Sequence, residues 1–84
     1  MQFRYYTDPG HGWVKVPRSL LEVLDIEGKI SRYSYARGES VYLEEDCDYG
    51  ILVKALENRG TKHSLARNHT NRSSKIRSYN SFIA

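Results

Sequence analysis

The residues of this chain with the clearest capacity for chemistry are a histidine in a turn and a short acidic run. His11 lies between two glycines, next to Trp13 in the pattern Gly-His-Gly-Trp. The acidic run comprises Glu44, Glu45, Asp46 and Asp48. A histidine together with a carboxylate is a pairing that general acid–base catalysis uses. The sequence has no serine or cysteine in a nucleophile motif and no phosphate-binding glycine loop, so we expect an exposed turn histidine and no enzyme.

Zinc binding is a second chemistry that the residue types suggest, through His63 and His69 with Cys47 and the acidic run. Zinc sites usually pair their ligands at short spacings, such as two cysteines two to four residues apart. The two histidines are six positions apart in a polar segment, and Cys47 is the only cysteine. We therefore expect no metal and no cofactor. A single cysteine also excludes an intramolecular disulfide, which favours the cytosol.

Positive charge is concentrated in the last third of the chain. Residues 58–84 hold six Lys and Arg and no acidic residue, whereas residues 1–57 hold seven basic and ten acidic residues. A basic segment of this kind attracts phosphates or an acidic protein surface. Alternatively, this basic segment pairs with the acidic run of the same chain, or its charges are simply those of a solvent-exposed tail.

Tyrosine is the other compositional excess, with seven in 84 residues. Tyrosines interleaved with arginines can stack on bases or anchor a protein interface. Completing a small core is the alternative role for these rings. Our candidate residues for binding a partner or a nucleic acid are Lys15, Arg18, Arg32, Tyr33, Tyr35, Arg37, Arg67, Arg72, Lys75 and Arg77.

Two strand pairs and two helices are predicted to position these residues. Residues 2–16 favour a hairpin that turns at Asp8-Pro9-Gly10, because proline and glycine suit a tight turn. Pro17 is expected at the first position of a short leucine-rich helix that ends at Gly28. A second hairpin is expected over 29–45, and a longer helix runs from a cap at Asp46 or Asp48 to Gly60.

These elements predict the α+β class: a small antiparallel sheet from two hairpins, one short and one longer helix, and a basic C-terminal arm. The core domain is expected over residues 1–57 and the basic polar arm over 58–84. Residues 58–74 are too polar for a predicted strand or helix and are expected as a loop or arm. Apolar residues after position 75 are expected to dock the end of the arm on the core.

Residues 12–43 resemble the AbrB-type swapped-hairpin DNA-binding family. The matching positions are Gly12, Val14, Val16, Pro17, Arg18, Leu20, Leu24, Ile26, Gly28, Gly38, Val41 and Leu43. The resemblance implies a dimeric regulator in which Lys15 and Arg18 contact DNA grooves or phosphates. The sequence departs from the family at Asp25, where a glycine is usual, at Lys29, where an acid is usual, and by one missing residue near Gly28.

Nearly the whole chain resembles small uncharacterised proteins of tailed phages and prophages, through "YYTDPGHGWVKVP", "YLEEDCD" and "SSKIRSY". That resemblance implies a bacterial host cytoplasm and a role in host takeover or in countering host defence. We expect a non-catalytic protein that binds and blocks a host protein, a protein–nucleic acid complex or a nucleic acid. A protein that sequesters a nucleotide signal near Tyr33 and Arg32 is the remaining alternative. Dimerisation is left open, and no run of about 18 apolar residues suggests a membrane span.

Overall fold

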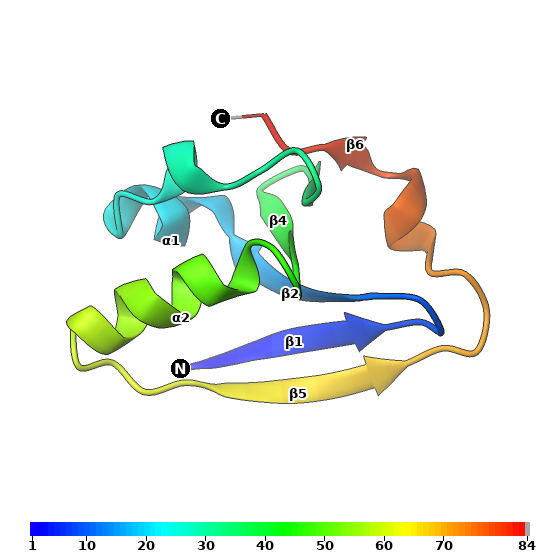
Figure 1. The fold of residues 1–84 in the computed structure, drawn as a ribbon, viewed down its shortest axis with the longest axis horizontal. Coiled ribbons are helices and arrows are strands. Elements are labelled where there is room, and N and C mark those ends of the chain that lie inside the picture. Colours follow the sequence, from blue (N-terminus) through cyan, green and yellow to red (C-terminus); the bar gives the residue numbers. More distant parts are fainter. Residues whose placement is uncertain (84) are drawn as a thin grey trace.

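The computed structural model describes residues 1–83 and confirms the α+β class. Six strands form one sheet in the order β5-β1-β2-β4-β3-β6 (Figure 1). The strands are β1 (Gln2–Thr7), β2 (Gly12–Pro17), β3 (Tyr35–Arg37), β4 (Ser40–Glu44), β5 (Ser64–His69) and β6 (Asn80–Ser81). The helices are α1 (Arg18–Val23) and α2 (Tyr49–Asn58), with 3₁₀ turns η1 (Glu27–Lys29) and η2 (Lys75–Ser78). All pairings are antiparallel except that of β1 with β5, which is parallel.

The basic segment after residue 57 supplies both edge strands of the sheet, β5 and β6. The expectation of a loop or arm is therefore wrong for Ser64–His69, which forms β5. This strand pairs with β1 along its whole length, from Gln2↔Ser64 to Thr7↔His69. An edge strand is held mainly by backbone hydrogen bonds and can carry polar side chains. Only Leu65 and Ala66 are apolar in it, so its hydrophobic pattern did not reveal it.

Helix α1 ends at Val23, five residues before Gly28, which we expected to end it. Pro17 precedes the helix as its cap, one position earlier than predicted. Asp25 adopts a left-handed backbone with φ of 55°. The N–H of Asp25 donates to the Glu22 carbonyl and that of Ile26 to the Leu21 carbonyl, both at 3.0 Å. This Schellman arrangement satisfies the last helix carbonyls, and Gly28 falls instead in the separate turn η1.

Replacing Asp25 with glycine is expected to raise the free energy of unfolding by about 0.5–1 kcal/mol. A left-handed backbone is strained for a residue with a Cβ atom and is free of that strain for glycine. Urea denaturation of the variant measures the gain. The matched control is Glu22→Gly inside the same helix, which is expected to lose about 1 kcal/mol. Equal losses in both variants would contradict the strain at Asp25.

The N-terminus of α2 is not capped in the way that the sequence suggested. Asp48 occupies the cap position, but its side chain makes no hydrogen bond to the helix N–H groups. Its carboxylate accepts instead from the backbone N–H and the hydroxyl of Ser31 and from the hydroxyl of Ser34. Asp48 is 2% exposed, so these hydrogen bonds compensate its burial and fix the segment before β3 onto the start of α2.

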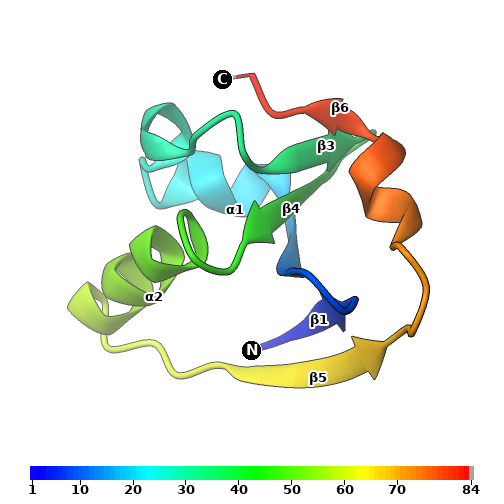
Figure 2. The same cartoon turned by 45° about the vertical axis from the view of Figure 1, so that its right-hand side comes forward.

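Both faces of the sheet are at least partly covered. Helices α1 and α2 pack on one face, where the main core includes Phe3, Val14, Val16, Leu21, Ile26, Ile30, Val41, Leu43, Leu52, Leu56 and Phe82. After β5 the chain runs from one edge of the sheet to the other (Figure 2). On this path η2 packs Ile76 with Trp13 and Tyr42 in a second cluster, flanked by Tyr6, Tyr35 and Tyr79. Most of the tyrosines therefore belong to one of the two hydrophobic clusters or pack against it. This is the alternative role that we gave for the tyrosine excess.

Candidate functional site

A groove of about 670 Å³ lies where β1 begins and β2 ends, beside α1. Its apolar lining is Met1, Phe3, Val16, Pro17, Leu20 and Val23, and its polar lining is Gln2, Arg4, Lys15, Ser19, Glu39 and Ser40. Met1 is 61% exposed and Val23 is 62% exposed, so two apolar side chains of this lining face solvent. Exposed apolar residues that line a groove with a polar rim are typical of an interaction site. We call this feature the basic groove.

Two cations lie side by side at the rim of the basic groove. Arg4 and Lys15 are direct partners in the β1–β2 register, so their side chains share one face of the sheet. Neither Arg4 nor Lys15 forms an ion pair within residues 1–83. The ion pairs in this part of the chain join His11 to Glu44, Arg18 to Glu27 and Arg77 to Asp8. Like charges directly opposite in a sheet are destabilising. The fold therefore holds two adjacent positive charges that form no ion pair within residues 1–83, in a groove whose one acidic lining residue is Glu39.

Two of the other predicted basic residues, Arg18 and Arg37, are engaged within the molecule. The Arg18 guanidinium lies 3.8 Å from Glu27 and 4.9 Å from the centre of the Phe82 ring. The Arg37 guanidinium lies 5.0 Å from the centre of the Tyr79 ring. Arg18 and Arg37 line one depression next to β6, away from the basic groove. Lys15 is thus the only one of these three predicted residues that lines the basic groove.

The predicted basic residues of the C-terminal third are dispersed. Arg67 lies with its guanidinium 5.8 Å from the centre of the Tyr5 ring. Arg72 and Lys75 line a separate depression beside Tyr6. Arg77 forms an ion pair with the buried carboxylate of Asp8. The structure does not gather these four side chains into one surface depression.

A second hollow, of about 310 Å³, lies between the β1–β2 turn and the loop that follows β4. It is lined by His11, Trp13, Tyr33, Tyr35, Glu44, Asp46, Cys47 and Arg77, and we call it the polar cleft. Tyr33 is 71% exposed and Tyr35 is half-buried. Arg32 is exposed and lies outside the lining. Of the residues that we predicted, the polar cleft brings together Tyr33, Tyr35 and Arg77.

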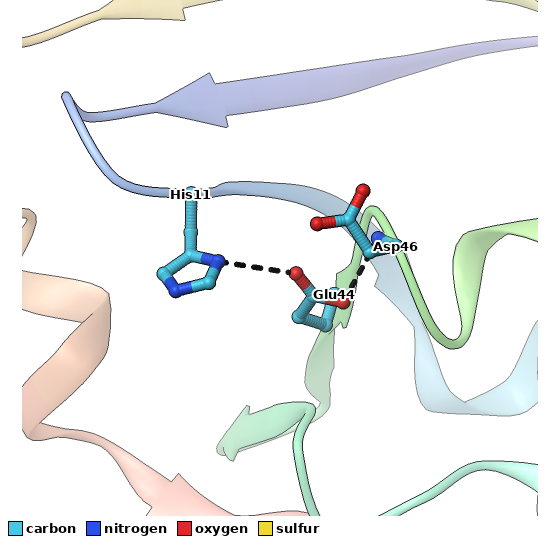
Figure 3. Close-up of side chains that lie close together, drawn as sticks. All are labelled: His11, Glu44 and Asp46. Atoms are coloured by element: carbon cyan, nitrogen blue, oxygen red, sulfur yellow. Dashed lines mark hydrogen bonds and ion pairs between the residues drawn. The ribbon is translucent and has the colours of Figure 1, made fainter.

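Glu44 is the central charged group of the polar cleft. Its side chain is 9% exposed, and its Oε2 accepts the backbone N–H groups of Asp46 and Cys47, each at 2.8 Å. Its Oε1 lies 3.4 Å from Nδ1 of His11 but forms no hydrogen bond (Figure 3). Nε1 of Trp13, which neighbours Glu44 in the β2–β4 register, is also buried without a hydrogen-bond partner.

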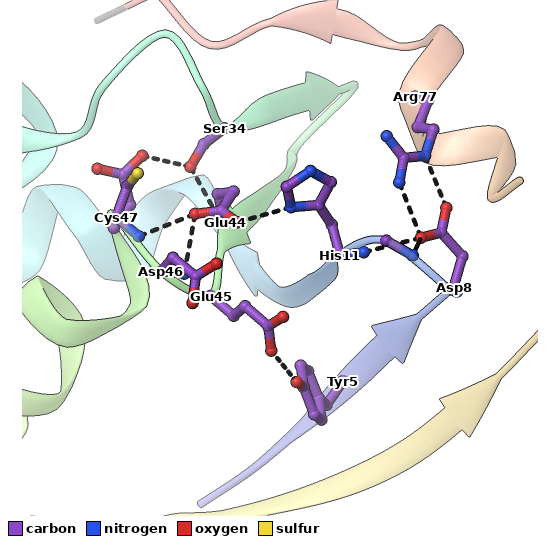
Figure 4. Close-up of polar contacts among 11 residues, drawn as sticks. Tyr5, Asp8, His11, Ser34, Glu44, Glu45, Asp46, Cys47 and Arg77 are labelled. Carbon is purple, nitrogen blue, oxygen red and sulfur yellow. Dashed lines mark hydrogen bonds and ion pairs between the residues drawn. The ribbon is translucent and has the colours of Figure 1, made fainter.

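Asp8 holds the β1–β2 turn and the C-terminal segment together beside the polar cleft (Figure 4). Its carboxylate accepts hydrogen bonds from Nε and Nη2 of Arg77, at 2.7 and 2.9 Å. It also accepts the backbone N–H groups of Gly10, His11 and Ser74, each at 2.9 Å. The hydrogen bonds from Arg77 hold the pKa of Asp8 far below its ordinary value, despite the burial of the carboxyl. The same pairing raises the pKa of Arg77.

Two further groups near the acidic run have raised pKa values. Burial, followed by the hydrogen bond to Glu45, raises the pKa of Tyr5 to about 12. The adjacent carboxylate of Glu44 raises the pKa of the Cys47 thiol. Since a thiolate is the reactive form of cysteine, Cys47 lacks the activation that nucleophilic catalysis needs. The carboxylates of the polar cleft favour cations and disfavour the phosphates of a nucleotide.

Sequence reasoning missed Arg4, Glu44 and Asp46 as site residues. Strand register could have found Arg4, because any antiparallel pairing that turns at Pro9-Gly10 brings it close to Lys15. Glu44 and Asp46 were considered only as members of the acidic run and were not chosen as site residues. Their proximity to His11 depends on the β2–β4 pairing, which joins residues about thirty positions apart.

Comparison of the chain with protein-family models, with curated proteins and with solved structures finds no match. The AbrB-type and phage resemblances therefore keep the status of sequence-based expectations. Among residues 1–83, neither helix has the length and apolar character of a transmembrane span.

Proposed function

We propose that this protein is a non-catalytic binding protein that blocks a host protein by seating an acidic and apolar segment of it in the basic groove. The resemblance to small phage proteins supports a bacterial host protein as the partner. The observation that carries the proposal is that Arg4 and Lys15, which form no ion pair within residues 1–83, line the same groove as the exposed apolar side chains of Met1 and Val23.

Charge complementarity determines the kind of segment that the groove favours. The facing cations destabilise the free sheet, and a carboxylate placed between them would relieve their repulsion. The apolar lining from α1 gives the same segment a surface on which to bury a leucine-like side chain. A segment with one or two acidic residues next to an apolar one satisfies both halves of the groove.

A protein partner explains this arrangement better than DNA does. Nucleic-acid surfaces are polar and strongly basic, and they track a phosphate backbone with many cations. A phosphate backbone offers nothing that would bury the apolar lining of the basic groove. In addition, the predicted cations Arg18, Arg37 and Arg77 are engaged with internal partners. The dimeric DNA-binding alternative would need Lys15, Arg18 and Arg37 on one surface, whereas Lys15 lies in a different depression from the other two.

Reversing the two rim charges, Arg4→Glu with Lys15→Glu, is expected to weaken partner binding roughly 100-fold, since like charges across an interface cost several kcal/mol. The partner is first captured from host-cell lysate on wild-type protein, identified by mass spectrometry and purified. Its affinity for each variant is then measured by calorimetry after nuclease treatment. The matched control is Arg72→Glu with Lys75→Glu, the same charge change outside the groove, which is expected to retain wild-type affinity.

A photo-crosslinking residue places the contact directly. Introduced at Val23 in the groove, it is expected to form one adduct with the partner, whereas at the exposed Lys54 on α2 it forms none. If Arg72→Glu with Lys75→Glu loses binding while Arg4→Glu with Lys15→Glu retains it, the contact lies in the C-terminal segment and the proposal is contradicted. Nuclease-sensitive capture would contradict it in favour of a nucleic acid.

A further inference from the structure

The polar cleft contains a second set of groups, independent of the basic groove, whose arrangement calls for a cation. His11, Glu44 and Asp46 each offer a ligand atom, and these atoms lie within 4.8 Å of one another. They come from three different points of the fold: the β1–β2 turn, the end of β4 and the loop that leads to α2 (Figure 3). A zinc-type ion binds nitrogen and oxygen ligands at about 2.0–2.2 Å, so three ligand atoms this close together are within reach of a single ion once the exposed His11 and Asp46 side chains turn toward Glu44.

The buried carboxylate of Glu44 is the observation that makes this more than a chance cluster. About nine-tenths of its side chain is buried, and Oε2 is fully used by two backbone N–H groups. Oε1 points toward His11 and has no hydrogen bond (Figure 4). A buried charged oxygen without a partner is rare in folded proteins and calls for a ligand. A metal ion bound by Oε1 supplies that partner.

The neighbouring charges leave this position free. Among the other residues of the acidic run, Glu45 binds Tyr5 and Asp48 binds two serine hydroxyls. Arg77, which lines the polar cleft, directs its guanidinium at Asp8 in a two-bond contact. In the part of the chain that the structure describes, the Asp46 carboxylate forms no ion pair. Apart from His11, whose charge depends on protonation, no cation among residues 1–83 pairs with the carboxylate of Glu44 or Asp46.

We propose that His11, Glu44 and Asp46 form a binding site for one divalent transition-metal ion of the zinc type. One imidazole nitrogen with carboxylate oxygens suits zinc, nickel or cobalt better than magnesium or calcium, which prefer oxygen ligands alone. Three protein ligands leave a further position for water. The ion joins the β1–β2 turn to the loop before α2. This site replaces our expectation of no metal, which considered His63, His69 and Cys47 together with the acidic run but did not consider His11 as a ligand.

The chain reports on this site through its single tryptophan. The ring of Trp13 lies 6.1 Å from that of His11, so a paramagnetic ion in the site quenches its fluorescence. The full-length protein, treated with EDTA and dialysed, is titrated with NiCl₂ for fluorescence and with ZnCl₂ for thermal unfolding. We expect saturable quenching at one ion per chain. At a ZnCl₂ concentration 100 times Kd we expect the melting temperature to rise by roughly 10–20 °C.

Four variants identify the ligands. His11→Gln and Asp46→Asn are each expected to weaken nickel binding at least tenfold, whereas His69→Gln and Cys47→Ser retain wild-type affinity. Circular dichroism of the metal-free variants confirms that they are folded. His11 and Asp46 are exposed, so their variants are expected to fold. These two variants therefore test the metal site even if Glu44→Gln fails to fold. Absence of quenching in the wild type, equal loss in His69→Gln, or loss in Cys47→Ser would each overturn the site.

Discussion

Replacing Asp8 with asparagine is expected to destabilise the protein by about 3 kcal/mol at neutral pH. One oxygen of the carboxylate accepts Gly10, His11 and Arg77, and the other accepts Ser74 and Arg77. Asparagine has an NH₂ group, which is a donor, in place of one carboxylate oxygen. In either orientation of the amide, this NH₂ group meets at least two of the N–H donors that now bond to Asp8. Loss of one member of a buried ion pair costs about 3–5 kcal/mol, and partial exposure of Arg77 favours the lower end.

The pH dependence of the same variant follows from the depressed pKa of Asp8. A carboxyl whose pKa is lowered by folding stabilises the folded state above its unfolded pKa of about 3.9, and this contribution is lost as the pH falls toward the folded value. Urea denaturation should therefore show the largest gap between wild type and Asp8→Asn at pH 7 and a smaller gap at pH 3. Glu22→Gln, on the exposed surface of α1, is the control and should change little at either pH. A gap that widens in acid would refute the role of Asp8.

Truncating Leu52 to alanine is expected to lower the free energy of unfolding by about 2–5 kcal/mol. Leu52 is fully buried in the main core, on the side of α2 that packs on the sheet. Removal of its side chain leaves a cavity that neighbours on the sheet and α2 fill only in part. The effect is measured as the shift of the urea midpoint at constant m-value.

Val23→Ala is the matched control for Leu52→Ala, because Val23 is an apolar helix residue that is mostly exposed. Its truncation is expected to change stability by less than about 0.5 kcal/mol, as is usual for surface positions. It also removes part of the lining of the basic groove, so a partner should bind this variant more weakly although its stability is unchanged. A Leu52→Ala loss as small as the control value would mean that α2 does not pack on the sheet.

Much of the main core could be predicted from the sequence because its elements carry strong local patterns. The alternation of Val14 and Val16 lies in β2, and the apolar spacing of Leu52 and Leu56 lies in α2. Strand β5 could not be predicted, since its position depends on pairing with the edge of β1 rather than on its own side chains. The end of α1 was misplaced for a related reason. Asp25 takes a conformation that is usual for glycine, so its residue type gave no signal.

The sites were less accessible to sequence reasoning than the core. Lys15 was predicted, but its significance lies in its partner Arg4, which only the strand register reveals. Arg77 was predicted as a partner-binding cation and instead pairs with Asp8, sixty-nine positions earlier in the chain. Long-range pairing of this kind leaves no trace in local composition. The basic character of residues 58–84 therefore overstated the charge that this segment offers to a partner.

The placement of β5 and β6 also governs how the chain folds during synthesis. The four inner strands β1, β2, β3 and β4 are complete once Glu44 has been made, yet their outer edges, on β1 and β3, stay unpaired until residues 64–69 and 80–81 follow. Such open edges are templates for pairing with other chains. Contacts between residues about sixty positions apart also form slowly, because closing a long loop costs entropy before any contact compensates it. The nascent protein is consequently most prone to aggregation in the interval between the emergence of β4 and the pairing of β5.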